Sequence, residues 1–345
     1  MSSPAPSSPG RPPESPSPDP EVTVIAVPRE RFSVTQRALE SLTREMAPGY
    51  RLVYVDGGSP PAIARYLTAQ ARARGFELIR TEHFLAPNEA RNLGLRDATG
   101  RYVVFIENDV LLAPGCLAAL VACAEETGAD LVGPIYGEGE PEKGFIHMAG
   151  GTAGIEKKEG ENRLAADRRF AGRRIADIES QLKREPTELL EFHCLLARLS
   201  TLRALGPLDE RLLSTAEEID LCFQVRERGG TIYVEPSARV SYVSPPPLDR
   251  SDLVFFWLRW SEAWTRTTFA RMRQKWNLSE RDPYFPEHIR WIRSHRRLAL
   301  QGVQGKIRRI LGRRLARWPL LALAFFEIVV NGMLIRDRER LSRQP

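Results

Sequence analysis

The chain has few of the residues that build disulfide frameworks and zinc sites. Its 345 residues include only four cysteines and five histidines. The cysteines show no CxxC pairing, and the histidines show no metal-ligand spacing. We therefore expect reduced, mostly buried thiols in a cytoplasmic protein, and neither a disulfide framework nor a zinc site.

The N-terminal region lacks apolar residues. Residues 1–20 are mostly Ser, Pro and Gly, which predicts a disordered leader. They contain no apolar core of the kind that a signal peptide requires, so nothing in the sequence suggests secretion. The 42% hydrophobic content is nevertheless enough for a substantial core, in one large domain or two ordinary ones.

Positive charge is concentrated at the C-terminal end. Residues 289–345 contain 14 Lys and Arg against 3 Asp and Glu, whereas the whole chain has a net charge of +6. Such a tail can meet nucleic acid, an anionic membrane surface or an acidic partner, or it can be an ordinary solvated helix face. No RNA- or DNA-binding motif is visible, which disfavours nucleic acid as the partner.

One stretch organises the rest of the chain. Residues 102–106 (YVVFI) form a continuous apolar run that ends abruptly in Glu107 and Asp109. Such a run is typical of a strand buried on both faces of a parallel sheet. Carboxylates at its carboxyl end would lie where open α/β sheets bind ligands, and their oxygens suit Mg²⁺ or Mn²⁺. The simpler alternative is a polar turn in which Asp109 caps the next helix.

The surrounding segments alternate between strand and helix. Strands are expected over 21–27, 51–55, 76–80, 102–106 and 130–135, and helices over 33–46, 62–74, 88–95 and 114–127. This alternation predicts an α/β fold with a mostly parallel, doubly wound sheet flanked by helices. The loops after Val27, Val55 and Ile106 all leave carboxyl ends of strands, so they can meet at one crevice.

From about Val22 to Lys275, the chain resembles a family 2 glycosyltransferase of the GT-A fold. No single match is decisive, but the matches occur in order and at suitable spacing. They are the first strand with Pro28, residues 55–59 (VDGGS), 90–94 (ARNLG), 107–109 (END), 208–212 (LDERL) and 216–222 (AEEIDLC).

The resemblance implies an inverting enzyme that moves a sugar from a nucleotide-sugar donor to a saccharide or lipid-linked acceptor, aided by Mg²⁺ or Mn²⁺. It implies that Asp109 binds the metal with help from Glu107, and that Glu218 or its neighbour Glu217 is the general base. The donor-binding residues that it implies are Pro28, Asp56, Arg91, Glu107 and Asp109.

Each of these residues also has a structural alternative. Asp56 lies in a turn whose composition is common in any turn, and Arg91 could be a solvated arginine. Glu217 and Glu218 could simply cap the helix that they begin.

Two positions depart from the family's pattern. Tyr242 stands where the family often has a histidine, and Gln224 where an arginine is often found. The alternative function is therefore that of a degenerate relative that binds its ligand without turnover.

Three regions of the second half remain to be interpreted, namely residues 137–186, the aromatic stretch of the C-terminal extension and the apolar segment 318–335. Residues 137–186 predict a long irregular excursion near the acceptor. His147 can line the pocket there, although structural roles are favoured for both His147 and His193. The sequence assigns 21–250 to the transferase domain and 251–345 to a helical, basic extension. In that extension Phe256, Trp260, Trp264 and Phe269 form one stripe, which favours packing on the catalytic domain, with an acceptor platform as the alternative.

Residues 318–335 form an apolar segment barely long enough to span a membrane. The sequence favours a helix buried against the domain or another subunit, which leaves a homo-oligomer open. Peripheral contact with an anionic membrane, at its inner face in the cytoplasm, is the alternative.

Overall fold

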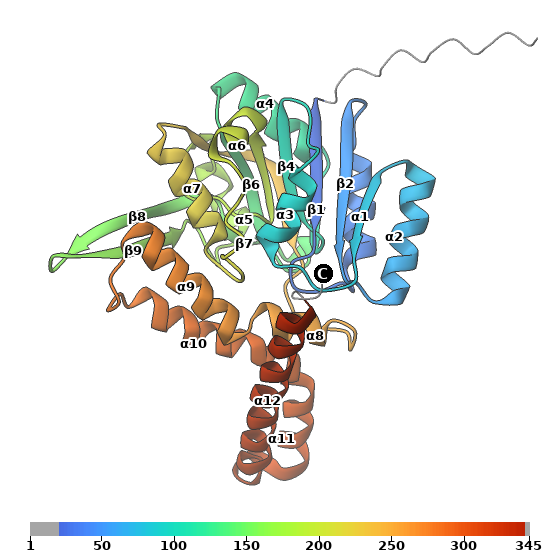
Figure 1. Ribbon diagram of the computed structural model, residues 1–345, viewed down its shortest axis with the longest axis vertical. Coiled ribbons are helices and arrows are strands. Elements are labelled where there is room, and N and C mark those ends of the chain that lie inside the picture. Colours follow the sequence, from blue (N-terminus) through green and yellow to red (C-terminus); the bar gives the residue numbers. More distant parts are fainter. Residues whose placement is uncertain (1–20, 342–345) are drawn as a thin grey trace, which may run out of the picture.

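A computed structural model describes residues 21–341. The expected leader, residues 1–20, lies outside the described residues. The chain forms one large sheet flanked by helices, with a helical region at its C-terminal end (Figure 1). The α/β fold expected from the sequence is confirmed, although the sheet is mixed.

The main sheet has ten strands in the order β10-β12-β6-β11-β4-β1-β2-β3, with β5 paired to β12 and β7 paired to β6. A separate hairpin pairs β8 with β9 and extends to one side of the body (Figure 1). The strands are β1 (Val22–Val27), β2 (Tyr50–Gly57), β3 (Glu77–Thr81), β4 (Tyr102–Glu107), β5 (Val110–Leu112), β6 (Leu131–Glu138), β7 (Phe145–Met148), β8 (Gly151–Lys158), β9 (Glu161–Arg168), β10 (Glu185–Pro186), β11 (Cys194–Arg198) and β12 (Ile232–Tyr242).

The α-helices fall into two groups, those along the sheet and those of the C-terminal region. The first group is α1 (Thr35–Glu45), α2 (Pro61–Arg74), α3 (Pro87–Leu95), α4 (Cys116–Thr127), α5 (Ile175–Ile178), α6 (Leu199–Leu205) and α7 (Glu217–Glu227). The second is α8 (Leu253–Arg259), α9 (Glu262–Trp276), α10 (Tyr284–Arg296), α11 (Gln301–Leu315) and α12 (Arg317–Leu341). Three short 3₁₀ helices are η1 (Pro141–Lys143), η2 (Glu179–Gln181) and η3 (Arg297–Leu300).

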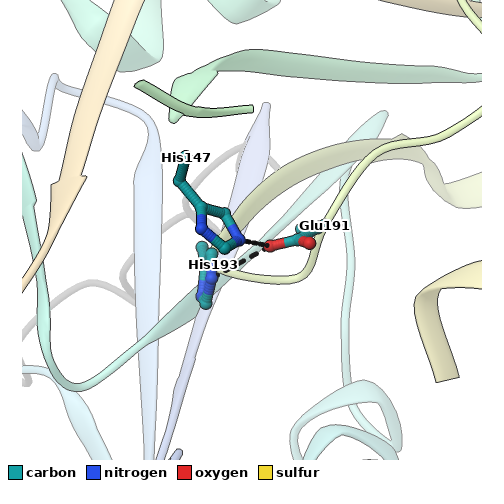
Figure 2. Close-up of side chains that lie close together, drawn as sticks. All are labelled: His147, Glu191 and His193. Atoms are coloured by element: carbon teal, nitrogen blue, oxygen red, sulfur yellow. Dashed lines mark hydrogen bonds and ion pairs between the residues drawn. The ribbon is translucent and has the colours of Figure 1, made fainter. Parts of the chain in front are cut away.

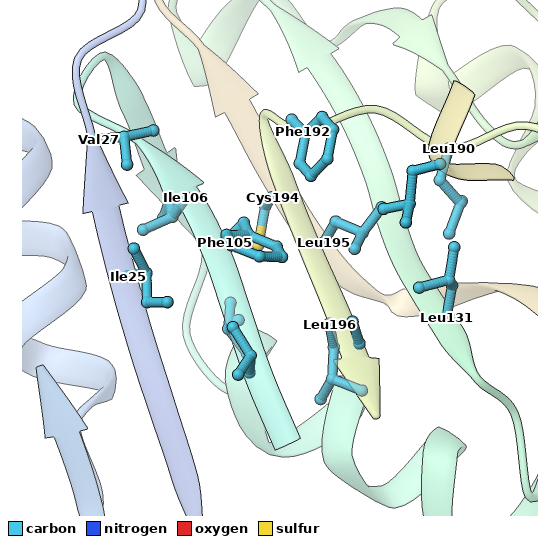
Figure 3. Close-up of a cluster of buried hydrophobic side chains, with 14 of the residues drawn as sticks. Ile25, Val27, Phe105, Ile106, Leu131, Leu190, Phe192, Cys194, Leu195 and Leu196 are labelled. Atoms are coloured by element: carbon cyan, nitrogen blue, oxygen red, sulfur yellow. The ribbon is translucent and has the colours of Figure 1, made fainter. Parts of the chain in front are cut away.

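The core lies between the central strands and the helices on either side of them. β1, β2, β3 and β4 are mutually parallel, whereas β11 runs antiparallel between β4 and β6. Figure 3 shows Ile25, Phe105 and Leu195 from three adjacent strands within one buried cluster. Burial on both faces explains why β4 is apolar throughout and becomes polar only at its end.

Two expectations about local structure differ from the structure. Residues 137–186 are largely ordered into β7, the β8–β9 hairpin and short helices, because the hairpin strands bond to each other and bury Ala153 and Leu164 in the core. The helix over 318–335 is not buried against the domain, the first of the two placements favoured from the sequence, since only one side of it packs on the protein.

The aromatic stripe of the C-terminal region is buried throughout, at Phe256, Trp260, Trp264 and Phe269. Phe269 joins the main core, and Trp264 packs with Ala86 at the start of α3, so the predicted packing on the catalytic domain is confirmed for these two. Phe256 and Trp260 instead lie in a cluster with Ile292 and Leu300 of the C-terminal region. Trp260 also reaches the cavity described below.

Candidate functional site

The corner that follows β4 positions the polar side chains of the site. The middle residue of the corner, Asn108, accepts a hydrogen bond from the Arg29 backbone N–H at 3.1 Å. Its side-chain nitrogen donates to the Arg31 carbonyl oxygen at 2.8 Å. Asn108 therefore holds the loop after β1 against the end of β4, with Glu107 and Asp109 on either side.

Glu107 is surrounded by cations. Its carboxylate accepts from Arg91 Nη2 at 3.0 Å and His193 Nδ1 at 2.6 Å, and Arg29 Nε lies at 3.0 Å. Burial alone would raise the pKa of Glu107, but these three neighbours, led by His193, lower it to about 2. Glu107 is therefore ionised and is the central anion of the cluster.

Asp109 has the opposite environment. Its side chain is buried, and neither carboxylate oxygen has a hydrogen-bond partner among the described residues. The Arg29 Nη1 atom lies 3.8 Å from Asp109 Oδ2. Burial raises the pKa of Asp109 to about 7, despite the attraction of Arg29. A buried carboxyl without partners costs folding free energy whenever it is ionised.

We expect Asp109→Asn to stabilise the protein at pH 8 and to have a smaller effect as the pH falls toward 4. Because the folded-state pKa of this acid is raised, the native state binds more protons than the unfolded state between about pH 4 and 7. Native stability is thus lost as the pH rises through that window, and the amide removes this cost. The expected gain is on the order of 2 kcal/mol, measured by urea unfolding.

The exposed residue Asp97 offers a matched control for this substitution. Asp97→Asn should leave the free energy of unfolding nearly unchanged at both pH values, since surface substitutions usually have small effects. A variant Asp109→Asn that is no more stable than the wild type at pH 8 would contradict the account of Asp109 as a destabilising buried acid.

A second pair of carboxylates comes from the start of α7. The preceding residue, Ala216, has a φ of 64°, a left-handed conformation that is strained for alanine and turns the chain sharply into the helix. Glu217 pairs with Arg259 Nη2 at 3.0 Å and lies 3.8 Å from Arg91 Nη1. Arg91 thus lies between Glu107 and Glu217.

Glu218 differs from its neighbour in having no such partner. It makes no ion pair or side-chain hydrogen bond with another residue in the described part of the chain, and it is half-buried. Burial, followed by the repulsion of Glu217 and Glu191, raises the pKa of Glu218 to about 8. A carboxylate that is partly exposed, unpaired and basic near neutral pH can accept a proton.

Three further side chains form a compact cluster, His147, Glu191 and His193 (Figure 2). One ligand atom from each lies within 4.8 Å of the others. Glu191 Oε2 is 2.9 Å from His147 Nε2 and 3.0 Å from His193 Nε2, and its other oxygen accepts from Arg168 at 2.6 Å. The sequence favoured structural roles for both histidines and left a position in the pocket open for His147; the structure places both on a cavity.

The imidazole of His193 is held between two anions and an aromatic ring. Burial and Arg29 lower its pKa, but Glu107 and Glu191 outweigh them and raise it to about 9. The ring stacks on Tyr242 with centroids 4.5 Å apart. Tyr242, which stands where the resemblance leads one to expect a histidine, thus packs against a histidine supplied by another segment.

These groups line a cavity of about 520 Å³. Its lining includes Glu107, Glu191, His193 and Glu218. The C-terminal helices supply aromatic side chains to the same cavity, namely Trp260, Tyr284, His288 and Trp291. The volume lies in the range of small-molecule sites in proteins.

The seven predicted site residues separate into two groups. Glu107, Glu217 and Glu218 line the cavity. The others are buried and do not belong to its described lining, namely Pro28, Asp56, Arg91 and Asp109.

Asp56 lies apart from the cavity. Its carboxylate accepts from the Ser59 N–H at 3.0 Å and the Ser59 hydroxyl at 2.8 Å, and pairs with Arg80. The Asp56 carboxylate therefore already has hydrogen-bond and ion-pair partners within and next to the corner after β2.

Helix α8 covers the loop after β1, next to the predicted donor residues. Asp252, just before the helix, accepts hydrogen bonds from the backbone N–H groups of Phe32 and Ser33 at 2.8 and 3.0 Å. The Phe255 ring packs against Phe32 and Phe84, with centroids 4.9 and 5.1 Å apart. A nucleotide approaching this loop would meet α8.

Sequence reasoning missed the two charged residues that follow Pro28. Arg29 contacts Glu107, and Glu30 is fully buried where it pairs with Arg29. Glu30 also accepts from Trp260 Nε1 at 2.6 Å and lies 3.2 Å from His295 Nε2. A signal was present, since charged residues directly after a buried strand belong to the same sheet edge as Glu107.

Two solved structures share the fold of this chain. The chain resembles a structure of GalNAc-T7 with UDP, GalNAc and Mn²⁺, with a TM-score of 0.52 and 14% identity over 84% of this chain and 58% of that one. It also resembles the mannosyltransferase PcManGT from Pyrobaculum calidifontis in complex with GDP-Man and Mn²⁺, with a TM-score of 0.50 and 16% identity over 92% and 85% of the two chains. The fold is that of GT-A proteins.

The sequence comparisons agree with the resemblance seen in the motifs. Residues 23–179, just under half of the chain, match the model of glycosyl transferase family 2. It is 27% identical over 237 residues to a pre-mycofactocin glycosyltransferase of Mycobacterium tuberculosis, covering 67% of this chain and 44% of the relative. It is 28% identical over 218 residues to the uncharacterized protein y4gI of Sinorhizobium fredii, covering 61% and 23%. The chain thus spans less than half the length of these relatives.

Proposed function

We propose that the chain transfers a sugar from a nucleotide-sugar donor to an acceptor hydroxyl, with inversion at the anomeric carbon. The match of residues 23–179 to the glycosyl transferase family 2 model supports the reaction class. The observation that carries the proposal is Glu218, a carboxylate on the cavity without an ion pair among the described residues and with a pKa raised to about 8.

The proposed reaction is a single displacement. Glu218 accepts the proton of the acceptor hydroxyl as its oxygen attacks the anomeric carbon. The bond from that carbon to the leaving diphosphate breaks, the nucleoside diphosphate departs, and the configuration inverts because attack and departure occur on opposite faces. Glu217 is held by Arg259 and serves to position α7.

A divalent cation fits the cluster of His147, Glu191 and His193. Two imidazoles and a carboxylate form a donor set that suits Mn²⁺ better than Mg²⁺. The predicted pair is less suited to it, because Arg29 contacts Glu107 and lies 3.8 Å from Asp109. Glu107 would instead orient His193 through its Nδ1 atom. When bound, the cation would neutralise charge on the leaving diphosphate.

We expect Mn²⁺ binding to weaken at least roughly tenfold in Glu191→Gln, and to change little in Asp109→Asn. Calorimetric titration of the protein with Mn²⁺ alone measures this without any need for turnover. If Asp109→Asn lost Mn²⁺ binding and Glu191→Gln kept it, the cation would bind at the corner after β4, as the sequence predicted. That result would overturn the histidine site.

A donor screen tests the reaction itself. The protein would be offered UDP-, GDP- and dTDP-sugars with Mn²⁺, and release of nucleoside diphosphate would be followed. Saccharide and lipid-linked acceptors form the panel, to which the name of one relative adds pre-mycofactocin. Release from one donor supports the transferase and identifies its sugar. Donor binding without hydrolysis or transfer across the panel would favour the degenerate relative instead.

A further inference from the structure

The last two helices form a hairpin that projects from the body of the molecule (Figure 1). α12 contacts α8 and α11. The 20-residue segment Arg317–Arg336 contains an 18-residue stretch with a mean hydropathy of 1.9, yet only 11% of that stretch is buried. It is long and apolar enough to cross a membrane, and it is not a core helix.

The polar side chains within the apolar stretch of α12 point toward the protein. Glu327 is buried and pairs with Arg296, and the Asn331 side chain donates to the Trp257 carbonyl oxygen. The outward side is apolar, with Trp318 72% exposed and Phe325 69% exposed. It also carries Leu321, Phe326, Ile328 and Met333, all exposed.

This arrangement is the reverse of an ordinary surface helix in water, which keeps its apolar stripe inside and its polar face outside. Large contiguous apolar patches are rare on soluble monomers and mark interaction surfaces. The helix therefore needs an apolar partner on its outer side.

The adjoining part of the hairpin is strongly basic. No acidic residue occurs between Gln301 and Phe326. Exposed cations gather along α11 and at the turn into α12, namely Lys306, Arg308, Arg309, Arg314 and Arg317. Trp318, at this same end, is of the residue type that prefers the boundary between water and lipid.

We propose that the α11–α12 hairpin binds an anionic lipid bilayer, with the outer side of α12 against the acyl chains and the cations of α11 against the phosphate head groups. A bilayer of this kind covers the apolar side and neutralises the basic residues together. A second copy of the chain would cover the apolar side, but its own segment from Gln301 to Phe326 would supply no acidic residues.

The test uses the full chain and vesicles of defined composition. The protein would be mixed with phosphatidylcholine vesicles, or with vesicles that also contain phosphatidylglycerol, and floated on a density gradient. We expect flotation with the anionic vesicles that weakens with salt. Phe325→Glu together with Phe326→Glu should reduce the bound fraction at least roughly tenfold.

Ile155→Glu is the matched control, because Ile155 is 40% exposed on the β8–β9 hairpin, away from α12. This variant should float like the wild type. Replacing Arg308, Arg309 and Arg314 with Gln should weaken binding to anionic vesicles by roughly fivefold for each charge removed.

Two results would overturn the proposal. One is a wild-type protein that remains in the soluble fraction with both kinds of vesicle. The other is a lipid-independent dimer, seen by sedimentation velocity, that becomes a monomer when Phe325 and Phe326 are changed to Glu. Unchanged melting temperatures and donor hydrolysis in the variants would separate loss of membrane binding from loss of folding or of the proposed reaction.

Discussion

Replacing Glu218 with glutamine is expected to reduce sugar transfer about 1,000-fold while leaving donor binding intact. Glutamine keeps the size of the side chain but cannot accept the proton of the acceptor hydroxyl. Because Glu218 is half-buried and makes no ion pair within the described structure, the substitution removes no ion pair that holds α7 in place. Initial rates and donor titrations of the two proteins measure the effect.

The pH profile distinguishes a base from a residue that merely shapes the cavity. Burial raises the pKa of Glu218 to about 8, so the wild-type rate should rise with pH up to about 8 and then level off. Glu227→Gln, at the other end of α7, serves as the control and should retain the wild-type rate and profile. If the residual activity of Glu218→Gln keeps the same rise, another group is the base.

Replacing Glu107 with glutamine should destabilise the protein by about 3 kcal/mol at pH 7. The amide leaves Arg29, Arg91 and His193 without their common anion in a buried place. In a chain of this size the melting temperature should fall by roughly 4 °C. Thermal unfolding followed by circular dichroism measures the change.

The loss of stability in Glu107→Gln should depend on pH in a definite direction. The pKa of Glu107 is lowered to about 2 in the folded state, so its contribution is complete above its ordinary value and is lost as the pH falls toward 2. The raised pKa of His193 means that its contribution is lost as the pH rises through about 9. The difference between variant and wild type should therefore be greatest between pH 5 and 8.

Glu140 provides the comparison, since it forms an exposed ion pair with Arg37. Glu140→Gln should change the free energy of unfolding by less than about 1 kcal/mol, because exposed ion pairs contribute little. Equal effects of the two substitutions would show that the anion at Glu107 is not the centre of a buried network.

The first half of the fold was predictable because its signals are local. The run over 102–106 had to be a buried strand, and the alternation from β1 to β6 follows from periodicity alone. The same reasoning located Glu107, and the resemblance to the family located Glu217 and Glu218; all three line the cavity.

The cluster of histidines could not be predicted in the same way. His147 comes from β7, and Glu191 and His193 from the segment before β11, and these elements meet because both pair with β6. Neither pairing leaves a fixed spacing in the sequence. The apolar composition of α12 likewise did not decide between burial and a membrane surface, and the structure shows that only one side of the helix packs on protein.

The contacts of Glu30 determine how the parts of this molecule could be exchanged with those of its relatives. This buried residue joins the loop after β1 to Trp260 and His295, which belong to the C-terminal helical region. The aromatic side of the cavity comes from that same region. The C-terminal helices are therefore not a detachable module, and a chimera that joined another protein's helices after residue 250 would have to supply partners for Glu30 as well as a new cavity wall.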